Sequence, residues 1–255
     1  MELVPTFKEQ LPQLKFTDAI SQQAVVKHVF SEWARHQAYV VHFMYYASYI
    51  LMQNDIRFLQ SMLLANNILI DGIGAQIYFK QLMNLKVSNL NGTDLSPLVI
   101  DYCVQNNLPL AFYGTTDEQI KRAAEKQEEM YGKKVVYYYQ NGFSPLAWSS
   151  IEPQSVLIVG MGSPIQENWV KDNIEELRQK NMLVFTVGGF FDFASGFYVR
   201  APIWVRKLKL EWAWRTILHP GRHYKKRLRD ATIIVKPFID KIKGYHRSVN
   251  FLFIK

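Results

Sequence analysis

An aspartate at the end of a short apolar run is the first residue of this chain that could do chemistry. Asp71 follows the run 67–70 and precedes Gly72, so it would stand where a buried strand turns into a helix. A carboxylate in that position can accept a proton from an attacking hydroxyl group. The same position also suits a helix N-cap, a role that Asp fills well. Both interpretations stay open for Asp71, and Asp192 could likewise be a functional carboxylate or a loop residue held by local hydrogen bonds.

A glycine turn between a strand and a helix is the second candidate. In VLIVGMGSPIQE, residues 156–167, the glycines are Gly160 and Gly162, and Pro164 stands at the helix entry. Free N–H groups and the helix dipole at such a turn suit a diphosphate. A nicotinamide enzyme would also need an acidic residue about 20 positions further on, whereas Asn181 lies in that stretch. The motif indicates a phosphate-binding loop, with a turn that binds no ligand as the alternative.

Glycine or a polar residue ends five of the predicted strands. In open α/β sheets ligands bind outside the carboxyl ends of the strands, where glycine lets the backbone come close. Each of these residues alone is better explained as a turn residue, but five in one topological position predict a shared cleft. They are Asp71, Gly114, Asn141-Gly142, Gly160 and Gly188-Gly189.

Alternating apolar runs predict the elements that position these residues. We expect strands at 39–46, 67–70, 108–113, 134–139, 155–159 and 183–187. Helices are expected at 17–36, from about 47, after the first of these strands, to about 64, and at 75–82, 117–130 and 166–179. Thr17 or Asp18 is the expected cap of the first helix. Strands that alternate with crossover helices predict a Rossmann-like parallel sheet with helices on both faces.

Composition excludes several classes of protein. With 255 residues, 49% of them hydrophobic and 20% charged, the chain can bury a core and is not disordered. The single cysteine, Cys103, excludes an internal disulfide and a cysteine-based zinc site, and its apolar surroundings predict a core residue. The six histidines do not cluster and no DxD or HExxH motif occurs, so we expect no bound metal. No GxSxG motif occurs either, which argues against a serine hydrolase.

Positive charge is concentrated at the end of the chain. Residues 200–255 contain 15 Lys and Arg against three acidic residues, a balance of +12, so residues 1–199 carry −4 of the net +8. We therefore expect an α/β domain at 1–199 and a basic, aromatic helical appendage at 200–255. Scattered cations are most often plain solvated surface, and no nucleic-acid-binding motif is present. A membrane surface fits best, because Trp and Tyr suit the interface and each cation near anionic lipid contributes about 1 kcal/mol.

No signal peptide and no run of about 20 apolar residues is visible. These observations predict a cytoplasmic protein that is peripheral on the inner face of the cell membrane. The oligomeric state stays open, with a homo-oligomer as one outcome.

Several long phrases in order carry a resemblance to a known family. They are DGIG (71–74), NGTDL (91–95), FYGTTDE (112–118), GMGSPIQENW (160–169), GGFFDFASGFYVRAPIW (188–204) and KLEWAWRTILHPGRHYKKR (209–227). From about residue 16 to 227 the chain resembles the WecG/TagA/CpsF glycosyltransferases, glycosyltransferase family 26, of bacterial surface-polysaccharide synthesis. The resemblance implies an inverting transfer, without metal or other cofactor, from a UDP-sugar to an acceptor linked to a polyprenyl diphosphate. It also implies an appendage that closes over the site and contacts the membrane.

The resemblance also implies roles for individual residues. Asp71 would be the general base, and Gln166 would line the donor site. Cations of the appendage would contact a diphosphate of donor or acceptor; they are Arg200, Arg215, Arg222 and Arg227. The complete donor set that we predict is Gly72, Gly114, Thr115, Asn141, Gly160, Gly162, Pro164, Gln166, Glu167, Gly188, Gly189 and Asp192.

Three positions depart from the family pattern. Ile70 replaces the usual proline before the Asp-Gly pair, Asn89 replaces the usual arginine, and residues 42–44 (HFM) replace a Thr-x-Asn phrase. The departures at His42, Met44 and Asn89 support a rival, a non-catalytic UDP-sugar-binding or lipid-binding relative. A second rival, an NAD-dependent oxidoreductase, rests only on the glycine turn. The donor sugar, of N-acetylmannosamine type or glucose type, and the acceptor stay open.

Overall fold

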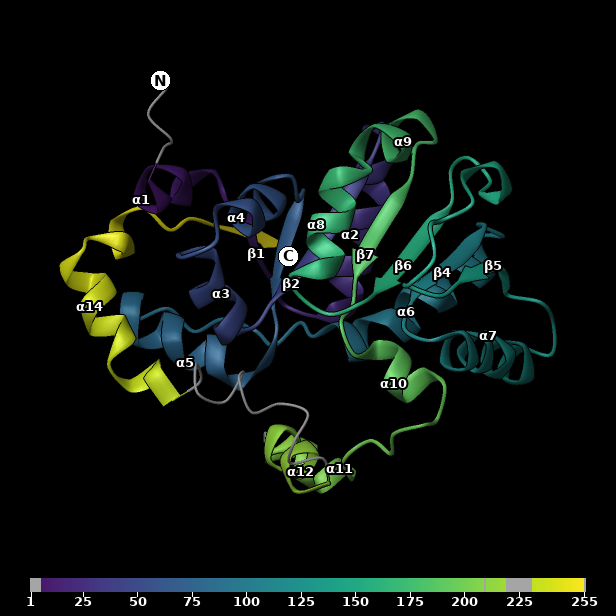
Figure 1. Cartoon of the computed structure of the whole chain (residues 1–255). Coiled ribbons are helices and arrows are strands. Elements are labelled where there is room, and N and C mark those ends of the chain that lie inside the picture. Colours follow the sequence, from purple (N-terminus) through teal and green to yellow (C-terminus); the bar gives the residue numbers. More distant parts are fainter. Residues whose placement is uncertain (1–5, 209, 219–230, 255) are drawn as a thin grey trace.

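An eight-stranded sheet, parallel throughout, forms the centre of the molecule (Figure 1). The computed structural model describes residues 6–208, 210–218 and 231–254. The strand order is β5-β4-β6-β7-β2-β3-β1-β8. The strands are β1 Phe16–Ala19, β2 Tyr39–Met44, β3 Asn67–Ile70, β4 Leu110–Gly114, β5 Val136–Gln140, β6 Val156–Gly160, β7 Leu183–Thr186 and β8 Phe251–Ile254. The predicted Rossmann-like α/β fold is confirmed.

Helices cover both faces of the sheet, as predicted. One face packs against α3 Tyr46–Met52, α4 Ile56–Leu63, α5 Gly72–Met83, α8 Ile165–Asp172 and α9 Ile174–Gln179. The other packs against α2 Gln22–Trp33, α6 Gly92–Gln105, α7 Asp117–Tyr131 and α10 Phe190–Ala194. The remaining described helices are α1 Phe7–Gln10, η1 Leu11–Gln13, η2 Trp148–Ser150, α11 Ile203–Lys207, α12 Glu211–Leu218, η3 Ala231–Ile234, α14 Lys236–Ile242 and η4 Tyr245–Arg247. Both apolar layers are buried, and Cys103 belongs to the second, which confirms it as a core residue.

The six predicted strands are all present, with ends that differ by at most two residues. The exact match is β3, at 67–70. Two predicted helices are divided: 47–64 into α3 and α4, and 166–179 into α8 and α9, which meet at Asn173. Strand patterns therefore located the carboxyl edge of the sheet well.

The predicted helix at 17–36 is wrong at its start. Thr17 and Asp18 lie in β1, which pairs on one side with β3 and on the other with β8. The helix α2 begins only at Gln22, and its cap is Ser21, whose side chain accepts a hydrogen bond from the Ala24 N–H. A four-residue strand held by two distant partners has no local signal that separates it from the helix that follows.

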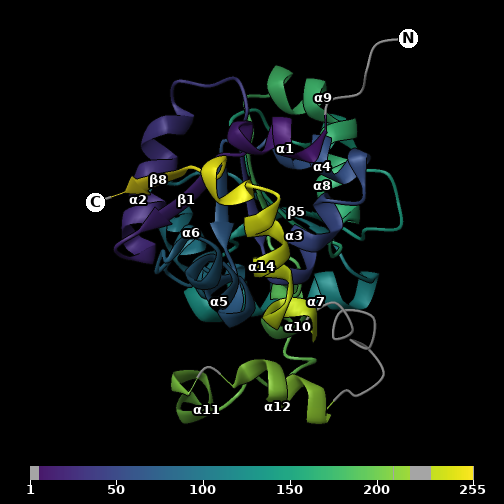
Figure 2. The ribbon, with the colours of Figure 1, turned by 90° about the vertical axis from the view of Figure 1, so that its left-hand side faces the viewer.

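The last part of the chain returns to the sheet (Figure 2). The strand β8 pairs in parallel with β1, and α14 packs on α5. Asp240 of α14 is fully buried and accepts hydrogen bonds from Tyr78 (2.6 Å) and Gln53 (3.1 Å), while Lys236 pairs with it at 2.6 Å. Residues that the sequence placed in the appendage thus complete one edge of the sheet, whereas α11 and α12 lie beneath α10, outside the two layers.

Candidate functional site

Asp71 lies directly after β3, at the N-cap position of α5. Its N–H donates to the carbonyl of Met44 at the end of β2 (2.9 Å), which fixes its backbone between two strand ends. Among the described residues its carboxylate makes no capping hydrogen bond to α5. Asn89 takes that part instead, because its Oδ1 accepts from the Gly72 N–H at 2.7 Å. The capping interpretation of Asp71 is therefore not supported, and Asp71 stands at the carboxyl edge of the sheet.

Three glycines at this edge are required by close packing of chain against chain. A Cβ on Gly114 would lie 2.2 Å from the Gly160 carbonyl oxygen, and one on Gly160 would lie 2.5 Å from the Phe191 ring. A Cβ on Gly142 would lie 2.8 Å from the side chain of Met161. Backbone hydrogen bonds from Thr115 N–H to Gly160 O and from Gly142 N–H to Thr115 O, both 3.0 Å, join the same loops. These glycines close the ends of β4, β5 and β6 against one another.

Three other glycines at the same edge face open space. Gly72, Gly162 and Gly188 have φ angles of +83°, +80° and +57°, and a Cβ on any of them would meet none of the described residues within 4 Å. They follow β3, β6 and β7. Positive φ explains why glycine is preferred there, and the space beside each Cα is not filled by the described residues. All three glycines belong to the predicted donor set, and their part in donor binding stays a prediction.

Gln166, in the first turn of α8, ties two of these open loops together. Its Oε1 accepts from the N–H groups of Gly162 and Gly188, each at 3.1 Å. Its Nε2 donates to Glu167 Oε1 (2.8 Å) and to the carbonyl of Thr186 (3.2 Å). The side chain is only 2% exposed. Gln166 therefore joins the loops after β6 and β7, and both ends of its amide are bonded within the protein.

Glu167 is fully buried next to Gln166. Its Oε1 accepts from Ser163 Oγ (2.7 Å) as well as from Gln166, and burial raises its pKa to about 7. Pro164 precedes these residues as the N-cap of α8, after a cis peptide bond. Glu167 thus reaches the loop backbone only through its neighbours, and a direct contact with a donor would require these buried groups to move.

A second polar chain links the loops after β4 and β7. Gln119 of α7 bonds to the Thr115 hydroxyl, and its Nε2 donates to Asp192 Oδ1 at 2.8 Å. Gln119 was not predicted as a site residue, although it follows the FYGTTDE phrase directly. Asn141 is 5% exposed, and its amide donates to Asp117 (2.6 Å) and Ser144 (3.2 Å). Asn141 therefore holds its loop through internal partners. The partner of Asp192, Gln119, lies in α7, so this bond is not of the local kind considered for Asp192, and Gly189 is the N-cap of α10.

Only one of the four predicted appendage arginines has a described side chain. Arg200 pairs with Asp94 of α6 (2.5 Å) and with Glu211 of α12 (3.5 Å), and so connects α12 with the first turn of α6. Arg215 lies in α12, but its side chain is outside the described part of the structure, as are Arg222 and Arg227 altogether. Contact of these arginines with a diphosphate stays a prediction.

The residues that depart from the family pattern lie in two different places. His42 is fully buried between strand and helix layers, where its Nδ1 lies 2.9 Å from the Thr186 hydroxyl, and burial lowers its pKa to about 4. Met44 is also fully buried. Asn89, in contrast, contacts the Asp71–Gly72 turn directly, as described above. The substitution at residue 89 therefore bears on the site more closely than those at 42 and 44.

Two further observations concern the described residues only. They contain no group of three or more His, Cys, Asp or Glu side chains arranged to hold a metal ion. No helix in these ranges combines the length and the apolar character needed to cross a bilayer. A cavity of about 490 Å³ is an open hollow between α7 and residues 195–197, lined mainly by charged side chains of α7, and does not include the strand-end residues.

Comparison with known proteins identifies the family. The model of the glycosyl transferase WecG/TagA/CpsF family matches residues 11–247. The chain belongs to this family. The predicted resemblance is thereby confirmed, and the oxidoreductase alternative is discarded.

Individual members of the family show which proteins this chain is similar to. It is 27% identical over 172 residues to a UDP-Gal:alpha-D-GlcNAc-diphosphoundecaprenol beta-1,4-galactosyltransferase of Shigella boydii, with 59% of this chain and 70% of that protein aligned. It is 29% identical over 163 residues to an N-acetylglucosaminyldiphosphoundecaprenol N-acetyl-beta-D-mannosaminyltransferase of Bacillus subtilis (62% and 63% aligned). A protein of the same description from Staphylococcus aureus is 24% identical over 160 residues (60% and 62% aligned). The alignments with the latter two span less than two thirds of those proteins.

Proposed function

We propose that this chain transfers a sugar from a UDP-sugar to an acceptor linked to a polyprenyl diphosphate, with inversion and without a metal ion. Membership of a glycosyl transferase family supports the reaction class. The names of its relatives, which act on GlcNAc-diphosphoundecaprenol, support the acceptor class. The observation that carries the proposal is the position of Asp71, at the carboxyl end of β3 beside the open backbone of Gly72.

The proposed chemistry is a single displacement at the anomeric carbon of the donor sugar. The acceptor hydroxyl oxygen forms the new bond to this carbon, the bond from the carbon to the phosphate oxygen breaks, and UDP leaves. Asp71 takes the proton of the attacking hydroxyl, as a positioned carboxylate does in general base catalysis. The charge that develops on the diphosphate is stabilised by oriented donors and cations, for which the appendage arginines are candidates.

Replacement of the proposed base is the first test. Asp71→Asn keeps the size of the side chain but removes most of its basicity, so we expect transfer to fall by about 100-fold or more while UDP binding stays near that of the wild type. Asp172→Asn is the matched control, because Asp172 is a surface carboxylate that pairs with Arg57 of α4. The measurement is sugar transfer to a polyprenyl-diphosphate-GlcNAc acceptor, together with calorimetric titration of UDP.

Full activity of Asp71→Asn would exclude the base role. A wild-type chain that binds UDP-sugars but transfers none of them would instead favour the non-catalytic relative. Screening UDP-hexoses and UDP-N-acetylhexosamines as donors identifies the sugar, for which relatives with galactosyl and N-acetylmannosaminyl names give two starting points.

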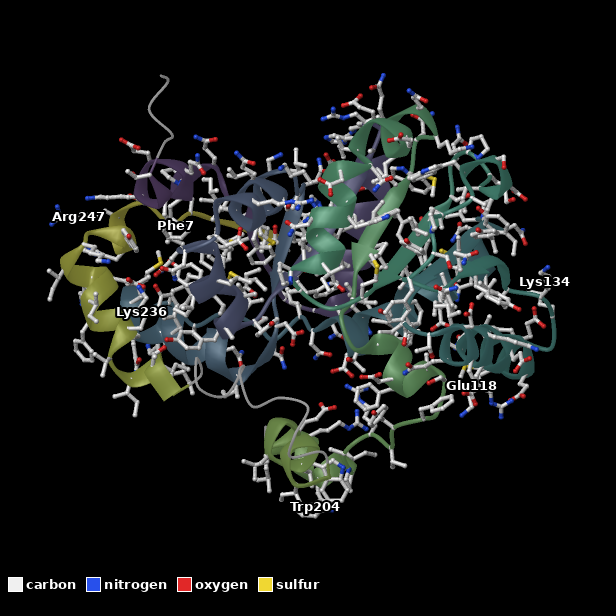
Figure 3. All side chains as sticks on the ribbon, in the orientation of Figure 1. Phe7, Glu118, Lys134, Trp204, Lys236 and Arg247 are labelled. Atoms are coloured by element: carbon white, nitrogen blue, oxygen red, sulfur yellow. The ribbon has the colours of Figure 1, made fainter. Side chains whose placement is uncertain are left out.

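Membrane contact through α11 is part of the proposal, since the acceptor is held in a bilayer. Ile203 and Trp204 of α11 are 63% and 64% exposed, and Trp204 lies on the side of this unit that faces away from the sheet (Figure 3). Such side chains together with cations are typical of a peripheral membrane surface. A cytoplasmic chain bound to the inner face of the membrane would reach its acceptor in this way.

Vesicle flotation tests this contact. We expect Ile203→Ser with Trp204→Ser to reduce flotation with phosphatidylglycerol-containing vesicles at least fivefold, because about 1.5–3 kcal/mol is lost for each large apolar side chain that no longer inserts. Met130→Ser is the control, since Met130 is 72% exposed on α7. Equal flotation of both variants would reject α11 as the contact.

A further inference from the structure

Glu167 is a buried acid next to Gln166, the residue that joins the glycine loops after β6 and β7. It is 0% exposed and lies in the first turn of α8. Within the described ranges its Oε2 has no hydrogen-bond partner, while Oε1 accepts from Ser163 and Gln166. A buried carboxyl group that is only half satisfied is unfavourable for stability. Its presence therefore calls for a function other than holding the core together.

The partners of Gln166 show what Glu167 does. A glutamine amide can be placed with either end forward, and its neighbours decide which. Glu167 Oε1 and the Thr186 carbonyl are acceptors, so they hold the Nε2 end on their side. The opposite end, Oε1, then faces the N–H groups of Gly162 and Gly188 and accepts from both. Without the acid, one of the two acceptors that fix the amide is lost.

We propose that Glu167 is a positioning residue of the donor site: by orienting the Gln166 amide it sets the spacing between the glycine loops after β6 and β7. The two loops follow neighbouring strands, and the space beside the Cα atoms of Gly162 and Gly188 is not filled by the described residues. A nucleoside diphosphate bound there spans both loops, so its affinity depends on their separation. That last step rests on the proposed function. The clamp itself, by which we mean the bonds from Glu167 to Gln166 and from Gln166 to Gly162 and Gly188, does not.

Three variants separate this role from a merely structural one. Glu167→Met fills a similar volume but cannot accept a hydrogen bond, and Glu167→Gln keeps an oxygen that can accept from Gln166 and Ser163. Glu176→Met, on the exposed surface of α9, is the matched control. Thermal unfolding of each variant checks that it folds.

Hydrogen-exchange rates of individual backbone amides, measured without any ligand, test the clamp. In Glu167→Met the amides of Gly162 and Gly188 are expected to exchange about tenfold faster than in the wild type, because the Gln166 oxygen that accepts from both is no longer held in place. The Thr115 amide, bonded to Gly160 O, keeps its rate. Glu167→Gln stays within about threefold of the wild type, since it still orients the amide. Unchanged rates for the two glycines in Glu167→Met, or equal rates in Glu167→Gln and Glu167→Met, overturn the clamp.

Calorimetric titration measures whether the clamp changes the affinity of the chain for UDP. Glu167→Met is expected to bind UDP about tenfold more weakly, and Glu167→Gln to recover most of that loss. Wild-type affinity in Glu167→Met, together with faster exchange, overturns the role toward the donor but not the clamp. A wild-type chain that does not bind UDP overturns the proposed donor, which the exchange data distinguish from failure of the clamp.

Discussion

Two neighbouring parts of the same sheet edge are built in different ways. At the ends of β4, β5 and β6, glycines bring backbones so close that Gly114 has no room for a Cβ beside Gly160. At the ends of β6 and β7, Gly162 and Gly188 face open space and are joined by the buried amide of Gln166. The first part is fixed by steric contact, and the second by hydrogen bonds to one side chain. Glycine thus serves packing in one part and leaves room for a ligand in the other.

Gly114→Ala should have the largest effect on stability. The new Cβ would lie 2.2 Å from the Gly160 carbonyl oxygen, at a φ of +139°. Steric overlap and the unfavourable backbone together should lower the free energy of unfolding by about 3 to 5 kcal/mol. Urea unfolding followed by circular dichroism measures the change. A loss below about 1 kcal/mol would show that the closed part is looser than described.

Gly188→Ala should change stability less and ligand binding more. Its φ of +57° costs alanine about 1 to 2 kcal/mol, with no steric overlap in the described part of the structure, where no atom lies within 4 Å of the new Cβ. A methyl group in the open space should nevertheless weaken UDP binding, which calorimetry at equal protein concentration would show. Equal losses of stability in Gly114→Ala and Gly188→Ala would remove the distinction between the two parts.

Much of this edge could be predicted from the sequence because strand ends leave local signals. Apolar runs that stop at Gly or Asp placed Asp71, Gly114, Gly160 and Gly188 at the correct end of the sheet. The family resemblance, carried by long phrases, was confirmed over residues 11–247. What a local pattern could not show is which glycines are packed and which are open, because the difference lies in contacts with other strands.

The features that the sequence missed depend on distant partners. The strand β1 is four residues long and is defined by its pairing with β3 and β8. Phe16 pairs with Ile68, 52 residues away, and with Phe251, 235 residues away. The return of α14 and β8 to the sheet depends on buried contacts such as that between Asp240 and Tyr78. Gln166 and Glu167 were predicted to bind the donor. Only the structure shows that both are buried, that Gln166 bonds to the backbone of the two loops, and that Glu167 bonds to Gln166.

The most direct measurement of the central claim is a crystal structure of the chain with UDP. The account predicts the diphosphate beside the open backbone of Gly162 and Gly188, with its leaving oxygen directed toward the side of the edge where Asp71 lies. UDP bound in the charged hollow between α7 and residues 195–197, or absent from the β6 and β7 loops at saturating concentration, would contradict it.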